Sequence, residues 1–221
     1  MIATTDQPYI LRVAALLLLF AGMILCLQPD QARAGKGLLE NVIGLDLGLQ
    51  GYTIGKKLTP EQRKIAKSHA EKDAHQGTLK FVDQDLHVVV DKDSGRVLAL
   101  YKRRENADQN TMKAMVADLM DRFGAPTVMA HDKIIYWAYN RHGAISEEDF
   151  ARAKKVDQVP KLGIIATVKL NSELEILPGP VDEKKKDKGA AEAEQKKKGV
   201  VYFIISSDPL VQKFLVRQSE K

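Results

Sequence analysis

The sequence contains five histidines, and their spacing argues against a metal site. His69 and His75 fall in one expected helix but six residues apart, which turns the two side chains about 120° away from each other. Two metal ligands on one helical face need a spacing of three or four residues. His87, His131 and His142 are scattered and form no ligand pair either. We therefore expect no metal and no other cofactor.

The acidic stretch Asp91-Lys-Asp93-Ser-Gly95 offers a second candidate for chemistry, because it has the form of the first half of a calcium loop. Such a loop also needs a bidentate Glu near its twelfth position, where this chain has Lys102. The polar tip of a β-hairpin explains the two aspartates without a metal, since Asp and Ser favour turns and Gly accepts a positive φ. We expect the hairpin.

The sequence contains neither a phosphate-binding loop for a nucleotide nor a common signature of nucleophilic catalysis. The stretch from Gly51 to Lys57 has three residues between its glycines instead of four, and no Ser or Thr follows the lysine. The chain lacks the G-x-S-x-G and H-E-x-x-H signatures. Its single cysteine, Cys26, lies in an apolar N-terminal run. We expect the protein not to be an enzyme.

The N-terminus has the pattern of a secretory signal peptide over residues 1–34. An apolar run covers residues 13–27, which is shorter than the roughly 20 residues that span a membrane, and Ala32-Arg33-Ala34 has the form of a cleavage site. Cleavage near Ala34 would deliver the protein to the periplasm or the exterior. The alternative is a membrane anchor formed by residues 13–27. Cleavage leaves the net charge of +5 unaltered, and nucleic acid is a poor partner for an exported protein.

We expect a Gly-rich lead-in over residues 35–58, flexible but with some leucines packed on the domain, and a single domain over residues 59–221. A helix should start at Thr59, because Pro60 suits the first helical position and Gln62 can complete a capping box. Two expected strands, 81–90 and 96–101, flank a turn at Lys92–Gly95. A helix from about Asn110 should end at Gly124, before Pro126.

The apolar residues of this central helix form one stripe with a period of 3.6 residues. The stripe consists of Met112, Met115, Val116, Leu119, Met120 and Phe123. It predicts that one face of the helix packs on a sheet. A third strand is expected at residues 133–140.

The second half of the chain alternates expected strands with polar segments. Residues 147–155 should form a short charged helix capped by Ser146, and residues 163–170 a fourth strand. The Lys-rich segment 178–199 has the composition of a disordered loop or of a lone helical excursion, and its ends should lie close together. Residues 200–206 are the most apolar strand and should be central in the sheet. A last helix should follow, with Ser207 or Asp208 as its cap and Pro209 in its first turn.

Together these elements predict an α+β fold with a largely antiparallel sheet of about five strands and helices packed on one face. The motif Leu119-x-x-x-Phe123-Gly-Ala-Pro126, followed by Trp137-Ala-Tyr139, resembles the second half of the small SmpA/OmlA-type envelope proteins. Residues 54–62 are similar to their first helix entry, but this chain lacks their lipobox cysteine and adds a hairpin and a Lys-rich loop. The resemblance implies an accessory, protein-binding role in outer-membrane assembly.

The sequence thus favours an exported, non-catalytic binding module that acts on a macromolecular partner in the cell envelope, most simply a protein. The alternatives are a hydrolase-like enzyme with an unrecognised site and, if the signal is not cleaved, a membrane-tethered structural protein. We expect the partner to contact the third strand and its exit, at Trp137, Tyr139, Arg141 and His142, because aromatic residues and Arg are enriched at binding hot spots. Trp137 could instead be a core residue of a covered sheet.

Overall fold

The computed structural model describes residues 37–72, 74–176 and 197–220. The expected signal peptide, its cleavage site, the alternative anchor at 13–27 and nearly all of the Lys-rich segment therefore lie outside the described residues. The described residues belong to one compact unit that begins at Gly37. Among them, the structure contains no helix that is both long and apolar enough to cross a bilayer.

Residues 37–58 form ordered structure, so the expectation of a flexible lead-in was wrong. Helix α2 (Leu38–Gly44) is followed by the short strands β1 (Gly48–Leu49) and β2 (Tyr52–Thr53). The β1–β2 turn has positive φ at Gln50 and Gly51, as the tightest hairpin turns require. Ile54 is fully buried, as is Val42 of α2, and Leu58 is nearly so. The expected packing of apolar residues on the domain is confirmed.

Helix α3 (Pro60–Ser68) begins as predicted. The Thr59 hydroxyl accepts a hydrogen bond from the Gln62 amide, and the Gln62 side chain accepts one from the Thr59 amide. The helix ends at Ser68, so the expectation that one helix holds both His69 and His75 was wrong. The chain then turns along strand β3 (Thr78–Asp83), where Ala70 pairs with Phe81.

The expected first strand, 81–90, is in fact a hairpin of β3 and β4 (Leu86–Asp91). Gln84 reverses the chain with a φ of 58°. Strand β5 (Val97–Ala107) follows the predicted turn and is longer than expected. Helix α4 (Gln109–Phe123) has Asp108 as its cap and ends at Gly124, whose φ is 77°. Both ends of α4 agree with the prediction.

Strands β6 (Val128–Ala130) and β7 (Ile134–Asn140) come next, then β8 (Gly143–Ala144) and helix α5 (Glu147–Lys155). The 3₁₀ helix η1 (Val159–Leu162) leads to β9 (Ala166–Ser172). Strand β10 (Gly199–Ser206) and helix α7 (Asp208–Ser219) complete the described chain, and Ser207 is the cap of α7.

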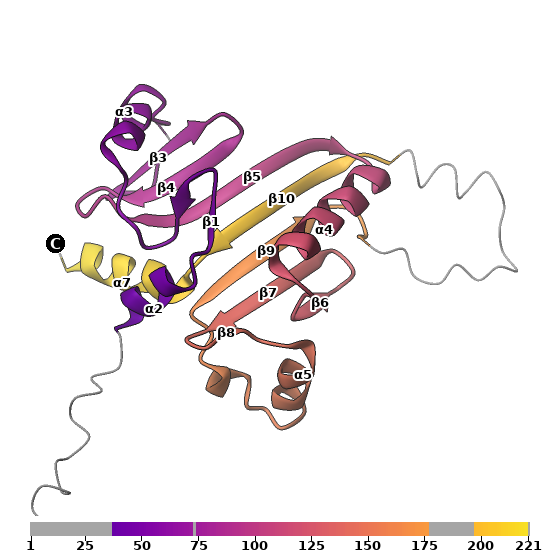
Figure 1. The fold of residues 1–221 in the computed structure, drawn as a ribbon. Helices are drawn as coiled ribbons and strands as arrows, with labels where there is room; N and C mark the ends of the chain where they lie inside the picture. The colour runs from indigo at the N-terminus through magenta and orange to yellow at the C-terminus, as the bar shows by residue number, and fades with distance from the viewer. Residues whose placement is uncertain (1–36, 73, 177–196, 221) are drawn as a thin grey trace, which may run out of the picture. The chain divides into compact units, whose positions relative to one another are not determined.

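The α+β class with an antiparallel sheet is confirmed, with eight strands in the main sheet instead of about five. The strand order is β3-β4-β5-β10-β9-β7-β6, with β8 paired to β7 (Figure 1). The predicted central position of the 200–206 strand is confirmed. Ser172 of β9 pairs with Val201 of β10, so the two strands that flank the Lys-rich segment are neighbours, as predicted.

Alternating burial along the strands defines two faces of the sheet. The inner face carries buried side chains such as Leu100, Phe203, Leu170 and Trp137. Helix α4 packs on this inner face, where the centre of the Phe123 ring lies 6.1 Å from the centre of the Phe203 ring. Met112 and Leu119 are buried in the same core, but Met120 is 43% exposed and does not belong to the buried stripe.

Candidate binding site

The opposite side of the sheet, which we call the outer face, contains a row of partly exposed residues on four adjacent strands. The row consists of Tyr101, Ile204, Lys169 and Tyr136, which pair in register across β5, β10, β9 and β7. Arg103 and Tyr202 pair in the next row. Each of these side chains alternates with a more deeply buried neighbour along its strand, because successive residues of a strand point to opposite faces.

Cations lie over aromatic rings at three places on the outer face. The Lys169 ammonium is 5.0 Å from the centre of the Tyr136 ring, and the Arg103 guanidinium is 5.9 Å from that of Tyr202. The Lys80 ammonium is 5.9 Å from the Tyr101 ring, on which His87 stacks at 4.4 Å. Such contacts hold cations over aromatic rings at a partly solvated surface.

The outer face is hollowed at one end into a pocket of about 800 Å³. Its floor is made by three strands and consists of Val128 and Ala130 of β6, Tyr136 and Ala138 of β7, and Thr167 of β9. The alanines leave space that larger side chains would fill. The walls come from α5, η1 and the first two turns of α7.

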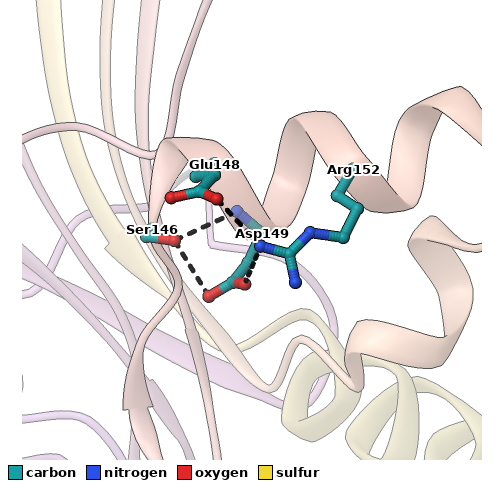
Figure 2. A network of polar contacts seen from close by, with 4 residues as sticks. All are labelled: Ser146, Glu148, Asp149 and Arg152. Atoms are coloured by element: carbon teal, nitrogen blue, oxygen red, sulfur yellow. Dashed lines mark hydrogen bonds and ion pairs between the residues drawn. The ribbon is translucent and has the colours of Figure 1, made fainter.

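Helix α5 places two residues in the pocket wall, Phe150 and Lys154, which are four residues apart and so share a helical face. The start of the helix is held by Ser146, whose hydroxyl accepts a hydrogen bond from the Asp149 amide. Figure 2 shows the Arg152 guanidinium at the carboxylates of Glu148, at 3.0 Å, and Asp149, at 3.7 Å. Arg152 is therefore neutralised within the helix.

Most of the pocket lining is apolar, with few charged groups. Lys154 and Asp208 carry the full charges of the lining. Asp208 is the first residue of α7, and its carboxylate lies 3.4 Å from the Ser206 hydroxyl. Among the described residues, Lys154 makes no ion pair. An apolar pocket with a small number of polar groups suits binding of an apolar ligand.

Two of the residues predicted to contact a partner are buried, so that part of the prediction was wrong. Trp137 is 1% exposed and Tyr139 8% exposed, because both lie on the inner face. The Trp137 indole donates a hydrogen bond of 2.8 Å to the Gly124 carbonyl, beyond the last turn of α4. Burial raises the pKa of the Tyr139 phenol above its ordinary value. The core alternative for Trp137 is the one observed.

Arg141 and His142 are exposed in the β7–β8 turn, as predicted. The Arg141 Nε donates to the His142 Nε2 at 3.0 Å. Their exposure leaves them accessible, but the two buried aromatic residues are not part of their surface. The sequence prediction therefore does not define one contiguous patch.

Asp91 has the turn role that the sequence favoured over calcium binding. Its carboxylate accepts hydrogen bonds from the Asp93 amide and the Ser94 hydroxyl, and forms an ion pair of 2.7 Å with Arg217 of α7. A cation of the protein itself thus occupies this carboxylate. Across the described residues, no group of three or more His, Cys, Asp or Glu side chains could hold a metal ion.

Replacing Asp91 with Asn should make stability less dependent on pH. Burial alone would raise the pKa of Asp91, but hydrogen bonds from Arg217, Ser94 and the Asp93 amide outweigh it and hold the pKa below its ordinary value. A lowered folded-state pKa contributes stability above the unfolded-state pKa of about 3.9, and this contribution is lost as the pH falls through the folded-state value. We expect a loss of about 1–3 kcal/mol at pH 7, since Arg217 can regain water.

Urea unfolding of both proteins from pH 7 to pH 2 measures this effect, with Asp121→Asn on the exposed side of α4 as the control. The gap between wild type and Asp91→Asn should narrow as the pH falls below about 4. A gap that is constant over the whole range would contradict the assigned role of the carboxylate.

Comparisons of the chain with protein-family models, curated proteins and solved structures returned no significant match. The resemblance to the SmpA/OmlA-type envelope proteins therefore stays a prediction from short motifs. The structure does show what two of those motifs do in this chain. Gly124 ends α4 with a positive φ, and the Trp137 indole donates a hydrogen bond to the Gly124 carbonyl.

Neither the pocket nor the outer face could be predicted from the sequence, because each is assembled from separate segments of the chain. The pocket walls combine residues from 128 to 212, and no short motif joins them. In residues 166–172 and 199–206, more buried and less buried side chains alternate along the strand. A matching alternation of residue types in the sequence can indicate a strand with one face less buried than the other. It does not say which residues a neighbouring helix will cover.

Proposed function

We propose that this protein is an exported, non-catalytic binding module of the cell envelope that acts on a protein partner with an acidic surface. The outer face is the observation that carries the proposal. It presents Tyr101, Tyr136 and Tyr202 together with Lys169 and Arg103. Tyr and Arg are enriched at protein interfaces, where large side chains with a polar end can be buried at low entropic cost.

The charge pattern of the outer face favours an acidic partner. Arg103 forms an ion pair with Glu105 at 2.9 Å and Lys80 with Glu71 at 2.7 Å, so their charges are partly compensated. Lys169, on β9, lies apart from both pairs and contacts the Tyr136 ring instead of a carboxylate. The net charge of +5 would speed association with a negatively charged surface. The envelope location rests on the signal-like N-terminus and on the resemblance of the motifs.

Site-specific photo-crosslinking in intact cells tests the proposal. A crosslinking residue at Tyr202 should trap one envelope protein, whereas the same residue at Val216, which is 56% exposed on α7, should not. Lys169→Glu should reduce the trapping from position 202 by about tenfold, by placing like charges together. Lys113→Glu is the matched charge control and should have little effect, because Lys113 lies on the solvent-exposed side of α4, away from the outer face of the sheet.

The same cells test export, because protein from the envelope fraction should begin at Gly35 when its N-terminus is sequenced. Equal trapping from positions 202 and 216, or trapping that is indifferent to Lys169→Glu, would contradict binding through the outer face. Turnover of an ester, peptide or glycan substrate that depends on one polar residue would contradict the non-catalytic role.

A further inference from the structure

The floor of the 800 Å³ pocket has few hydrogen-bonding groups to offer a ligand. Strands β7 and β9 lie inside the sheet, so their backbone donors and acceptors are used by neighbouring strands on both sides. In the wall, the Ile165 amide donates to the Tyr139 carbonyl at 2.8 Å, and the Ile165 carbonyl accepts from the Ser207 hydroxyl at 2.6 Å. Besides Lys154 and Asp208, the hydrogen-bonding side chains of the lining are His131, Tyr136, Thr167 and Gln212. A strongly polar ligand would therefore regain only some of the hydrogen bonds that it loses to water.

Apolar side chains line both the floor and the walls of the pocket. Val128, Ala130 and Ala138 lie in the floor, and Phe150, Val159 and Ile164 line one side. These side chains favour a ligand that is itself a hydrocarbon. An extended peptide is disfavoured, because its backbone amides would find partners only along the outer edge of β6, which is three residues long.

Lys154 supplies the polar end of the site. It is exposed, shares the pocket-facing side of α5 with Phe150, and makes no ion pair with any described residue. Arg152, two positions earlier, is held by Glu148 and Asp149 (Figure 2). Asp208 of α7 also lines the pocket and would repel a second anion. A ligand with one negative charge at one end therefore fits with that end at Lys154.

We propose that the pocket binds a single acyl chain with an anionic head group, the chain lying on the floor and the head group at Lys154. The shared chemistry belongs to free fatty acids and to anionic lysophospholipids. This inference goes beyond the proposed protein-binding function and does not depend on it. The two can be separated, since the pocket is tested with purified protein and lipid alone.

Isothermal titration of the purified mature protein with saturated fatty acids of increasing length tests the apolar part. Each added methylene that enters the pocket should tighten binding about fourfold, until the chain exceeds the floor. A parallel titration with lysophosphatidylglycerol distinguishes the two sources by their affinities. A series without dependence on chain length would overturn the proposal.

Substitutions test the placement of the ligand. Ala138→Phe and, separately, Ala130→Phe should fill the floor and weaken binding by more than about tenfold. Ala99→Phe is the matched control, because Ala99 lies on the same side of the sheet but outside the pocket lining. Ala130 is on the edge strand β6, so its variant should fold even if the more buried Ala138 variant does not.

The head-group contact is tested with Lys154→Gln, which should weaken fatty-acid binding about twofold to fivefold and leave a fatty alcohol of equal length unaffected. Lys155→Gln, on a neighbouring position outside the lining, is the control. The proposal is overturned if the two lysine variants behave alike, or if folded Ala130→Phe binds as tightly as Ala99→Phe. An extended apolar peptide that outcompetes every acyl ligand would also overturn it.

Discussion

Replacement of Trp137 with Ala should lower the free energy of unfolding by about 3–5 kcal/mol, a large share of the stability of an ordinary domain. The side chain is 1% exposed, and its ring centre lies 6.3 Å from that of Phe123. Removing it leaves a cavity between α4 and the sheet. It also removes the hydrogen-bond donor of the Gly124 carbonyl.

Urea unfolding followed by circular dichroism measures this loss. Trp137→Phe is the matched control, since it keeps most of the packing and deletes the indole N–H; we expect a loss of about 1–2 kcal/mol. A loss below about 1 kcal/mol for Trp137→Ala would mean that the residue contacts solvent or a partner, which was one of the two interpretations of the sequence.

Leu119→Ala should lower the free energy of unfolding by about 2–5 kcal/mol. Leu119 is 9% exposed and belongs to the core between α4 and the inner face. Met120 is the next residue on the same helix but is 43% exposed, so Met120→Ala should change stability by less than about 0.5 kcal/mol. Comparing the two variants separates the loss of core packing, which only Leu119→Ala should show, from the effect of the substitution on helix propensity.

Because the chain has one tryptophan, and Trp137 lies under α4, its fluorescence can follow unfolding of both variants. Equal losses for Leu119→Ala and Met120→Ala would show that α4 does not pack through the side assigned to it. A small loss for both would place the helix away from the sheet.

The starts of the helices and the end of α4 could be predicted from the sequence because local contacts determine them. Thr59 and Gln62 bond to each other's backbone amides within one turn, and Ser146 and Ser207 act over three residues. Gly124 adopts a conformation that few other residues tolerate. In each case the residue type alone restricts the local structure.

The missed features depend on contacts that are distant in the sequence or on an atypical turn. The β3–β4 hairpin turns at Gln84, where no Gly, Pro or Asn marks the reversal, so its two strands were interpreted as one. Residues 37–58 are ordered because the core receives Val42 and Ile54, which composition cannot indicate. The covered side of β7 depends on where α4 packs, and this decided the position of Trp137 and Tyr139.

The central place of β10 has a consequence for the order in which the chain can fold. In the sheet, β3-β4-β5 and β9-β7-β6 are joined through β10, which is the last strand of the described chain. A nascent chain that stops before Gly199 holds two half-sheets with no ladder between them, each with an unpaired edge. The eight-stranded sheet can therefore form only after β10 has been synthesised, however early the strands on either side of it are made.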